Sequence, residues 1–249
     1  MLTAYFDESG QEQKDWMFVA GYVGNDEAWK NFIGPWQDAI TPRKHLHMNR
    51  LRFKRESERL MLERVSSVLK GSGILPFMVG IKQSDYCDLL TGSAMERALS
   101  GYILCCVFLV FRALQKLPPE EHLEVVFEEQ QVYGHLHHIG LSVITRYAKE
   151  LKFISSDGKC RLSNWRSVPK DQTSLTEPAD CLAYSFLQLS RDSTSTRARW
   201  CSPILDSMED RGSGFLLQPA MVREFVGTEV FTALIREARH DLRGQNGKE

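Results

Sequence analysis

The chain has 249 residues, of which 43% are hydrophobic and 25% are charged, and its formal net charge is −1. This balance is typical of a globular protein with its own core, and it excludes a uniformly basic nucleic-acid coat protein. Binding of nucleic acid through a local basic patch is still compatible with it.

The cysteine pattern and the apolar runs indicate the cellular compartment in which we expect the protein. None of the six cysteines forms a C-x-x-C pair, so we expect reduced, mostly buried thiols and no zinc module. The N-terminus lacks the pattern of a secretory signal, and the longest apolar run, Tyr102–Phe111, is half of the roughly 20 residues that cross a membrane. We therefore expect a cytoplasmic protein with no membrane partner.

The first part of the chain predicts a hairpin, two helices and a strand. Two apolar runs, Leu2–Asp7 and Trp16–Val23, flank a polar turn, which predicts a β-hairpin. Helices are predicted over Asp26–Ile40 and Glu56–Leu69 from the spacing of their apolar residues. Ile74–Ile81 then has the composition of a strand.

Helices and strands alternate in the next part of the chain. In order, the predicted elements are helix, strand, helix, strand and helix, over Ser93–Leu117, Leu123–Phe127, Gln131–Leu151, Lys159–Val168 and Glu177–Leu189. The alternation predicts an α/β fold with a mixed sheet flanked by helices. We expect one domain over residues 1–249, with a core at 1–190 and a helical C-terminal extension at 191–249.

The predicted extension is Arg-rich at first and then helical near Met221–Leu242. Its apolar residues Phe215, Leu216 and Leu217 fit either a homodimer contact or a cover for the core.

Acidic residues stand where apolar strands and helices end or begin. Asp7 and Glu128 each follow an apolar strand, and Asp180 lies in the first turn of an apolar helix, three residues after Glu177. Acids in such places are costly unless they are paired, and Mg²⁺ or Mn²⁺ is a partner that prefers oxygen ligands. The alternatives are solvated loop acids and first-turn acids that complement a helix dipole.

Two segments resemble a known family. Tyr5-Phe6-Asp7-Glu8-Ser9-Gly10 resembles the D-E-S-G signature of a ribonuclease H-like domain-of-unknown-function family, family 3800, which is widespread in bacteria and phages. Pro178-Ala179-Asp180-Cys181-Leu182-Ala183-Tyr184 resembles the late A-D-x-x-A-Y helix of that family. The resemblance covers most of residues 2–189 and implies a ribonuclease H-like fold and a metal-dependent nuclease.

The resemblance also implies roles for individual residues. Asp7 corresponds to the first-strand acid and Asp180 to the late-helix acid of the metal centre. Glu128 corresponds to the middle-strand acid, where the family often has Asp, and Glu129 is the alternative. His47 lies where the family often has a histidine near its site, and the alternative is a core or solvated histidine.

One departure from the family concerns the residues before the late acid. Relatives commonly have Leu-Gln before Ala-Asp, whereas this chain has Thr176-Glu177-Pro178. Glu177 is therefore either an additional metal ligand or a sign of an altered site, and Glu8 and Glu129 are further candidates to complete the ligand shell.

Basic residues gather in two places. The first group follows the first predicted helix and contains Arg43, Lys44, Arg50, Arg52, Lys54, Arg55 and Arg59. The second contains Arg191, Arg197 and Arg199. Local positive charge of this kind is needed to bind a phosphate backbone, but it also occurs on ordinary solvated surfaces. His135, His137 and His138 form a small cluster that we interpret as an exposed helix start.

The leading hypothesis is a Mg²⁺- or Mn²⁺-dependent phosphodiesterase acting on DNA or RNA, with Asp7, Glu128 and Asp180 holding the metal. The rival is a catalytically inactive nucleic-acid or protein-binding module of a phage-defence or mobile-element system. A small-molecule phosphohydrolase is a third reading.

Overall fold

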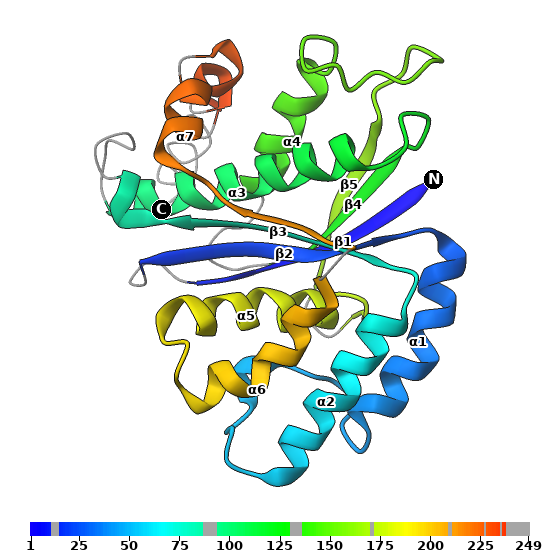
Figure 1. The fold of residues 1–249 in the computed structure, drawn as a ribbon. Helices are drawn as coiled ribbons and strands as arrows, with labels where there is room; N and C mark the ends of the chain where they lie inside the picture. The colour runs from blue at the N-terminus through cyan, green and yellow to red at the C-terminus, as the bar shows by residue number, and fades with distance from the viewer. Residues whose placement is uncertain are drawn as a thin grey trace, which may run out of the picture.

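A computed structural model describes residues 1–10, 15–86, 94–129, 136–169, 172–208, 211–226, 228–234 and 236–237. In these residues a six-stranded sheet lies between two layers of helices (Figure 1). The strands are β1 Leu2–Ser9, β2 Trp16–Gly24, β3 Leu75–Lys82, β4 Leu123–Glu128, β5 Leu162–Val168 and β6 Ser213–Leu216. The α-helices are α1 Asp26–Ile40, α2 Glu56–Gly71, α3 Ala94–Lys116, α4 Leu136–Arg146, α5 Glu177–Arg191, α6 Thr196–Leu205 and α7 Pro219–Val226.

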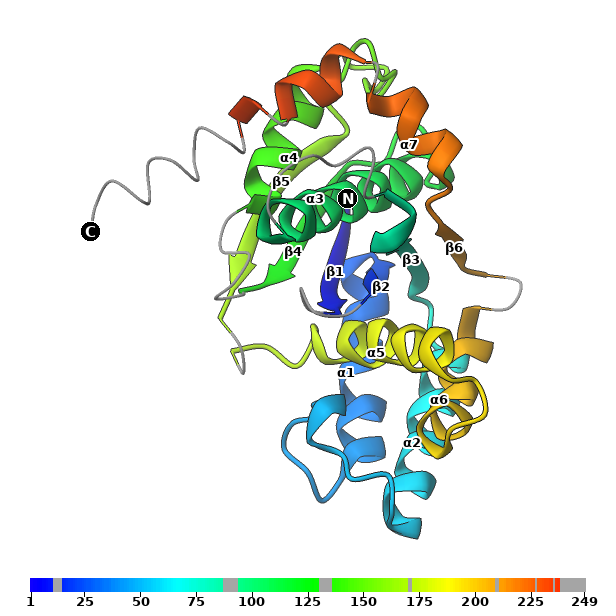
Figure 2. The same ribbon diagram turned by 90° about the vertical axis from the view of Figure 1, so that its left-hand side faces the viewer.

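The order of the strands defines the fold class. The order across the sheet is β5-β4-β1-β2-β3-β6, which Figure 2 displays from left to right. β2 is antiparallel to both of its neighbours, β1 and β3, whereas β4 is parallel to β1, β5 is parallel to β4, and β6 is parallel to β3. The chain therefore has an α/β fold with a mixed sheet flanked by helices, as the sequence predicted, and it is consistent with a ribonuclease H-like fold.

The opening hairpin depends on a glycine of the D-E-S-G segment. Gly10 follows β1 with φ +118°, a conformation that residues with a side chain rarely adopt. A Cβ atom at Gly10 would lie 2.2 Å from the carbonyl oxygen of Trp16, so the start of β2 can approach only a glycine. The close approach sets the register in which Asp7 lies opposite Ala20.

Each face of the sheet has its own core. α3 packs on one face, where Ala4, Phe6 and Phe127 point toward its apolar side chains. α5 crosses the other face against β1 and β2, and α1, α2 and α6 lie on that side too (Figure 1). Because side chains alternate along a strand, each residue of β1 or β4 is assigned to one of these two cores.

The segment after residue 190 differs from the expected helical extension. It contains α6 and α7, but β6 joins the sheet edge beside Phe77–Gly80 of β3. β6 is only four residues long, follows Gly212 and contains Gly214, so it has too little alternation to be recognised from sequence. Leu217 is 3% exposed and Phe215 packs against the core on the α3 side, so both residues cover this core, the second of the two roles considered for them.

Several element ends also differ from the prediction. Asn25 caps α1, because its side chain accepts a hydrogen bond from the Ala28 N–H, and the helix begins at Asp26 as predicted. The helix predicted over Gln131–Leu151 is described from Leu136 and ends at Arg146, before a turn in which Lys152 has φ +59°. The predicted tail helix appears as α7 and a further turn at 229–234, and its end near Leu242 lies outside the described residues.

The structure also bears on the membrane and cysteine expectations. In the described part of the chain, no helix is both long enough and apolar enough to cross a membrane. Cys105, Cys106, Cys181 and Cys201 are free and buried, and Cys160 is free and half-buried. Cys87 lies outside the described residues.

Candidate functional site

Two of the predicted acids lie side by side on neighbouring strands. Phe6 of β1 pairs with Phe127 of β4 in parallel register, so the next residues, Asp7 and Glu128, are neighbours across the two strands. Both phenylalanines point to the α3 side, and alternation therefore directs both acids to the α5 side. Neighbouring strands lie about 4.7–4.9 Å apart. Asp7 is 4% and Glu128 is 3% exposed, so two largely desolvated carboxylates lie on neighbouring strands.

The start of α5 closes over this pair. Thr176, which precedes the helix, donates its Oγ1 hydrogen to Glu128 Oε2 over 3.1 Å. Ala179 and Ala183 are 0% exposed, and these small side chains let the helix lie close to the sheet. The A-D-x-x-A-Y segment therefore has a packing reason for its alanines as well as a place for its acid.

Asp180 lies on the same side of the sheet as the strand acids. Burial raises the pKa of the Cys181 thiol well above its ordinary value, and the charges of Asp180 and Asp7 raise it further. Asp180 Oδ2 accepts a hydrogen bond of 2.8 Å from the backbone N–H of Met48. Asp180 therefore links α5 to the loop between α1 and α2, which carries the first basic group.

Glu177 has a structural role in this geometry. It is 3% exposed, and its two oxygens accept hydrogen bonds from Trp36 Nε1 at 2.9 Å and His45 Nδ1 at 2.8 Å. Burial raises its pKa, and these two donors and the Leu46 N–H act in the opposite direction. Glu177 and Asp180, one helical turn apart, thus hold the 45–48 loop against α5.

The structure does not bring Glu8 and Glu129 to the same place. Glu8 follows Asp7 and points to the opposite side, where its charge raises the pKa values of buried Tyr102 and Cys106 after the larger effect of burial. Glu129 lies beyond the end of β4 and is exposed. These two acids are adjacent to the pair in sequence, and the backbone N–H of Glu8 donates a hydrogen bond of 2.9 Å to Asp7 Oδ1.

The first basic group is an exposed loop ordered by one buried acid. The six candidate side chains Arg43, Lys44, Arg50, Arg52, Lys54 and Arg55 are exposed. Glu58, which is 5% exposed, accepts hydrogen bonds from the backbone N–H groups of Arg52 and Lys54 and from the Arg43 guanidinium. Burial alone would raise the pKa of Glu58, but these donors outweigh it and lower the pKa. The loop is thus held from within while its cations face solvent.

An aromatic stack joins the two basic groups. Phe53 has a positive φ of 54° and is 4% exposed, so packing holds its backbone in an unfavourable conformation. Its ring stacks on Tyr184 of α5, with centroids 5.8 Å apart and an interplanar angle of 6°, and also contacts Trp200 of α6. The Arg197 guanidinium lies 5.7 Å from the centre of the Phe53 ring. Arg197 of the second group therefore lies beside the first group.

The histidines lie in two different places. His47 is 5% exposed and stands in the loop that Glu177 and Asp180 hold, so it is a core histidine close to the candidate site. His137 is 1% exposed on the α3 side, and its Nε2 lies 2.8 Å from Ser167 Oγ, while His138 Nε2 lies 3.2 Å from the same oxygen. The prediction of an exposed helix start is therefore wrong for His137, and His135 lies outside the described residues.

Among the residues that the structure describes, no group of three or more His, Cys, Asp or Glu side chains is arranged to hold a metal ion. The Asp180 carboxylate is engaged with the Met48 N–H, and the Glu177 carboxylate with Trp36 and His45. A pair, Asp7 and Glu128, is what the two strands bring together. Mg²⁺ fits such a pair, because it commonly binds one or two carboxylates and completes its shell with water and substrate phosphate.

Sequence reasoning assigned no individual role to three residues that shape the site. Thr176 donates to Glu128, and Phe53 stacks on Tyr184, the last residue of the A-D-x-x-A-Y segment. Comparison with protein-family models gives no match, and comparison with curated proteins gives none either.

Proposed function

We propose that this protein is a Mg²⁺- or Mn²⁺-dependent hydrolase of phosphodiester bonds in nucleic acid. The observation that carries the proposal is the desolvated pair Asp7 and Glu128 on neighbouring parallel strands, on the face that also carries the basic loop. Two buried carboxylates on neighbouring strands make a negative place that suits a divalent cation.

The residues of the chain have distinct parts in this proposal. Asp7 and Glu128 hold the cation, and Thr176 orients the Glu128 carboxylate through its hydroxyl. When bound, the cation would act as a Lewis acid and would lower the pKa of a water molecule that it binds. Asp180 keeps the basic loop next to the pair through the Met48 N–H, and the exposed cations Arg50, Arg52 and Lys54 bind the phosphate backbone.

The experiment compares substitutions of neighbouring acids. Purified protein is incubated with single- and double-stranded DNA and RNA in Mn²⁺, Mg²⁺ or EDTA. We expect metal-dependent cleavage that Asp7→Asn and Glu128→Gln each reduce by at least about 100-fold, in line with loss of electrostatic stabilisation of the transition state. The matched controls are Glu8→Gln and Glu129→Gln, which remove the adjacent acids that point elsewhere, and these should retain cleavage.

A second candidate function is binding of nucleic acid without cleavage. It is favoured by the observation that the described residues contain no three-ligand metal group and that Asp180 and Glu177 hold a loop. Wild-type protein that binds oligonucleotides, shows no cleavage in any metal and shows no Mn²⁺ binding dependent on Asp7 would establish this function and refute the hydrolase.

A further inference from the structure

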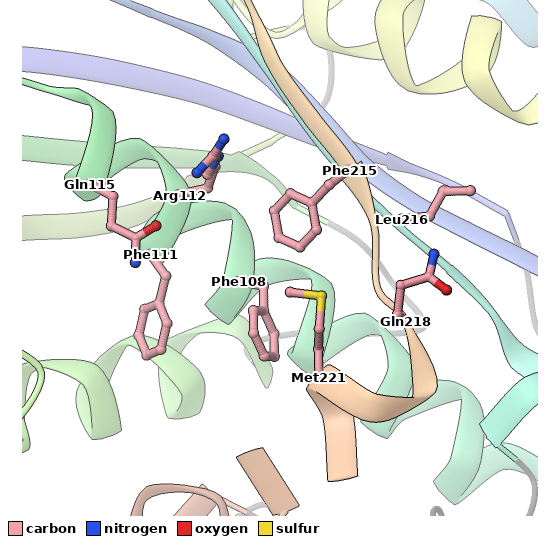
Figure 3. Close-up of a pocket in the computed structure, with 8 residues that line it drawn as sticks. All are labelled: Phe108, Phe111, Arg112, Gln115, Phe215, Leu216, Gln218 and Met221. Atoms are coloured by element: carbon pink, nitrogen blue, oxygen red, sulfur yellow. The ribbon is translucent and has the colours of Figure 1, made fainter. Parts of the chain in front are cut away.

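A cavity of 440 Å³ lies on the opposite side of the sheet from Asp7 and Glu128. It is an open pocket between α3, β6 and the start of α7, and Figure 3 shows the side chains that line it. Its volume is within the range of about 300–1,000 Å³ that is typical of small-molecule sites. The cavity is therefore separate from the proposed hydrolase site and large enough for a small organic ligand.

The walls of the cavity are mostly aromatic and already packed. Phe108 meets Phe215 edge-on with ring centroids 6.4 Å apart, and it lies 6.0 Å from Phe111. Phe225 supports both rings from α7, at 5.0 Å from Phe108 and 6.1 Å from Phe111. Edge-on contacts of this kind favour fixed ring orientations, so the aromatic wall of the cavity is ordered by its own packing.

One cation lines this apolar space. Arg112 of α3 is half-buried, and its Nε donates a 2.5 Å hydrogen bond to Ser213 Oγ. Ser213 is only 6% exposed. In the described part of the chain, no carboxylate lies within ion-pair distance of Arg112. Because Nε is engaged with Ser213, the guanidinium is oriented, and its terminal N–H groups form a fork that matches a carboxylate.

The other polar groups of the cavity are uncharged. Gln115 and Gln218 contribute carboxamides, and Leu216 and Met221, each 38% exposed, line the side that opens to solvent. A single positive charge among apolar walls suits a monoanion with an apolar body. A dianionic phosphate would need more positive charge than this lining provides, and an organic cation would be repelled by Arg112.

We propose that this cavity binds a small apolar monocarboxylate, with the carboxylate on the Arg112 guanidinium and an aryl or alkyl body among Phe108, Phe111, Phe215 and Met221. The site is independent of the proposed hydrolase function. It rests on the shape and charge of the cavity alone.

The test uses a matched pair of probes in calorimetric titrations of the full chain. 2-Naphthoate carries the charge, and 2-naphthamide has the same apolar body without it. We expect saturable binding of naphthoate that is at least about tenfold tighter than binding of the amide, as a charge-assisted bidentate contact implies. Arg112→Gln should remove that preference and leave binding of the amide unchanged.

Two further variants keep the result interpretable. Lys116→Gln removes an exposed charge one helical turn beyond Arg112 and should leave both affinities unchanged. Leu216→Glu places a negative charge at the exposed rim, and it should weaken binding of naphthoate and not of the amide. Equal affinity for the two probes, no saturable binding, or an unchanged preference in both Arg112→Gln and Leu216→Glu would overturn the proposal.

Discussion

Two buried carboxylates hold the 43–58 region of the chain, and their pKa values move in opposite directions. Glu58 accepts hydrogen bonds from backbone N–H groups and from Arg43, and these lower its pKa against the effect of burial. For Glu177 burial is the larger effect, and it raises the pKa despite the donors Trp36 and His45. The same type of side chain therefore favours the ionised form in one place and the protonated form in the other.

This contrast predicts opposite pH dependence for two matched substitutions. A lowered pKa in the folded state stabilises the fold above the ordinary value of 4.5, and this stabilisation is lost as the pH falls. A raised pKa stabilises the fold below 4.5, and this is lost as the pH rises through the folded-state pKa. In going from pH 6.5 to about pH 4, the difference in unfolding free energy between wild type and Glu58→Gln should shrink. Over the same pH change, the unfolding free energy of the wild type should increase relative to that of Glu177→Gln.

Denaturant titrations of the three proteins at several pH values measure this difference. Each variant serves as the control for the other, because both remove one buried acid from the same region. At neutral pH, Glu58→Gln should lose about 1.5–3 kcal/mol, the range for hydrogen bonds to a charged group. Parallel pH profiles for the two variants would contradict the assignment of opposite shifts.

At the scale of elements, the C-terminal ends of two helices are capped by arginines from distant parts of the chain. Arg161, 6% exposed just before β5, donates to the carbonyl oxygens of Leu114, Leu117 and Pro118 at the end of α3. Arg211, just before β6, donates to Leu69 O at 2.8 Å and to Ser72 O at the end of α2. These contacts satisfy carbonyl groups that have no partner within the helix.

Replacing either arginine should therefore destabilise the protein as a whole. Arg161→Met and Arg211→Met leave several carbonyl groups without their donors, and we expect a loss of about 2–4 kcal/mol in unfolding free energy for each. Arg166→Met is the control, because Arg166 is exposed and pairs with Glu124 on the sheet surface. Thermal and denaturant unfolding measure the losses, and a control as destabilised as the two variants would exclude the capping explanation.

These elements also mark what sequence can predict and what it cannot. Period and composition predicted the five longer strands to within a few residues, because each has enough apolar residues to repeat a pattern. β6 was missed, and the distant arginines of α2 and α3 leave no local signal at the helix ends. Asp7, Glu128 and Asp180 were predicted from the sequence as candidate site residues. The register of β1 and β4, which the sequence does not reveal, places the first two on neighbouring strands. The hydrogen bonds from Trp36 and His45 to Glu177 join residues more than 130 positions apart in the sequence, so no local pattern could predict them.

At the scale of the molecule, charge is distributed unequally between the two sides of the sheet. The α5 side carries the acid pair, and Asp180 and the Phe53 stack bind the basic loop to it. Arg197 brings the second basic group to the same side. The α3 side carries the apolar cavity with its one arginine. A net charge of −1 therefore conceals two local groups of exposed cations on one side of the sheet.

That distribution predicts how oligonucleotide affinity depends on salt. Each phosphate contact releases counterions, so the logarithm of affinity falls with the logarithm of salt concentration by about 0.7 per contact for a single strand. Arg52→Gln and Arg197→Gln should each make this slope shallower by about that amount and weaken binding at low salt. Arg146→Gln is the control, because Arg146 is an exposed cation of α4, which lies on the other side of the sheet (Figure 1).

Fluorescence anisotropy with Asp7→Asn protein in EDTA, at several salt concentrations, measures binding without cleavage. If Arg146→Gln changed the slope as much as the other two substitutions, attraction would come from the whole molecule and not from the α5 side. If none changed it, the basic loop would be a solvated surface. A change confined to Arg52→Gln and Arg197→Gln would place the polyanion across both basic groups. In that position it passes the Asp180 contact with Met48, on the side of the sheet that carries the acid pair.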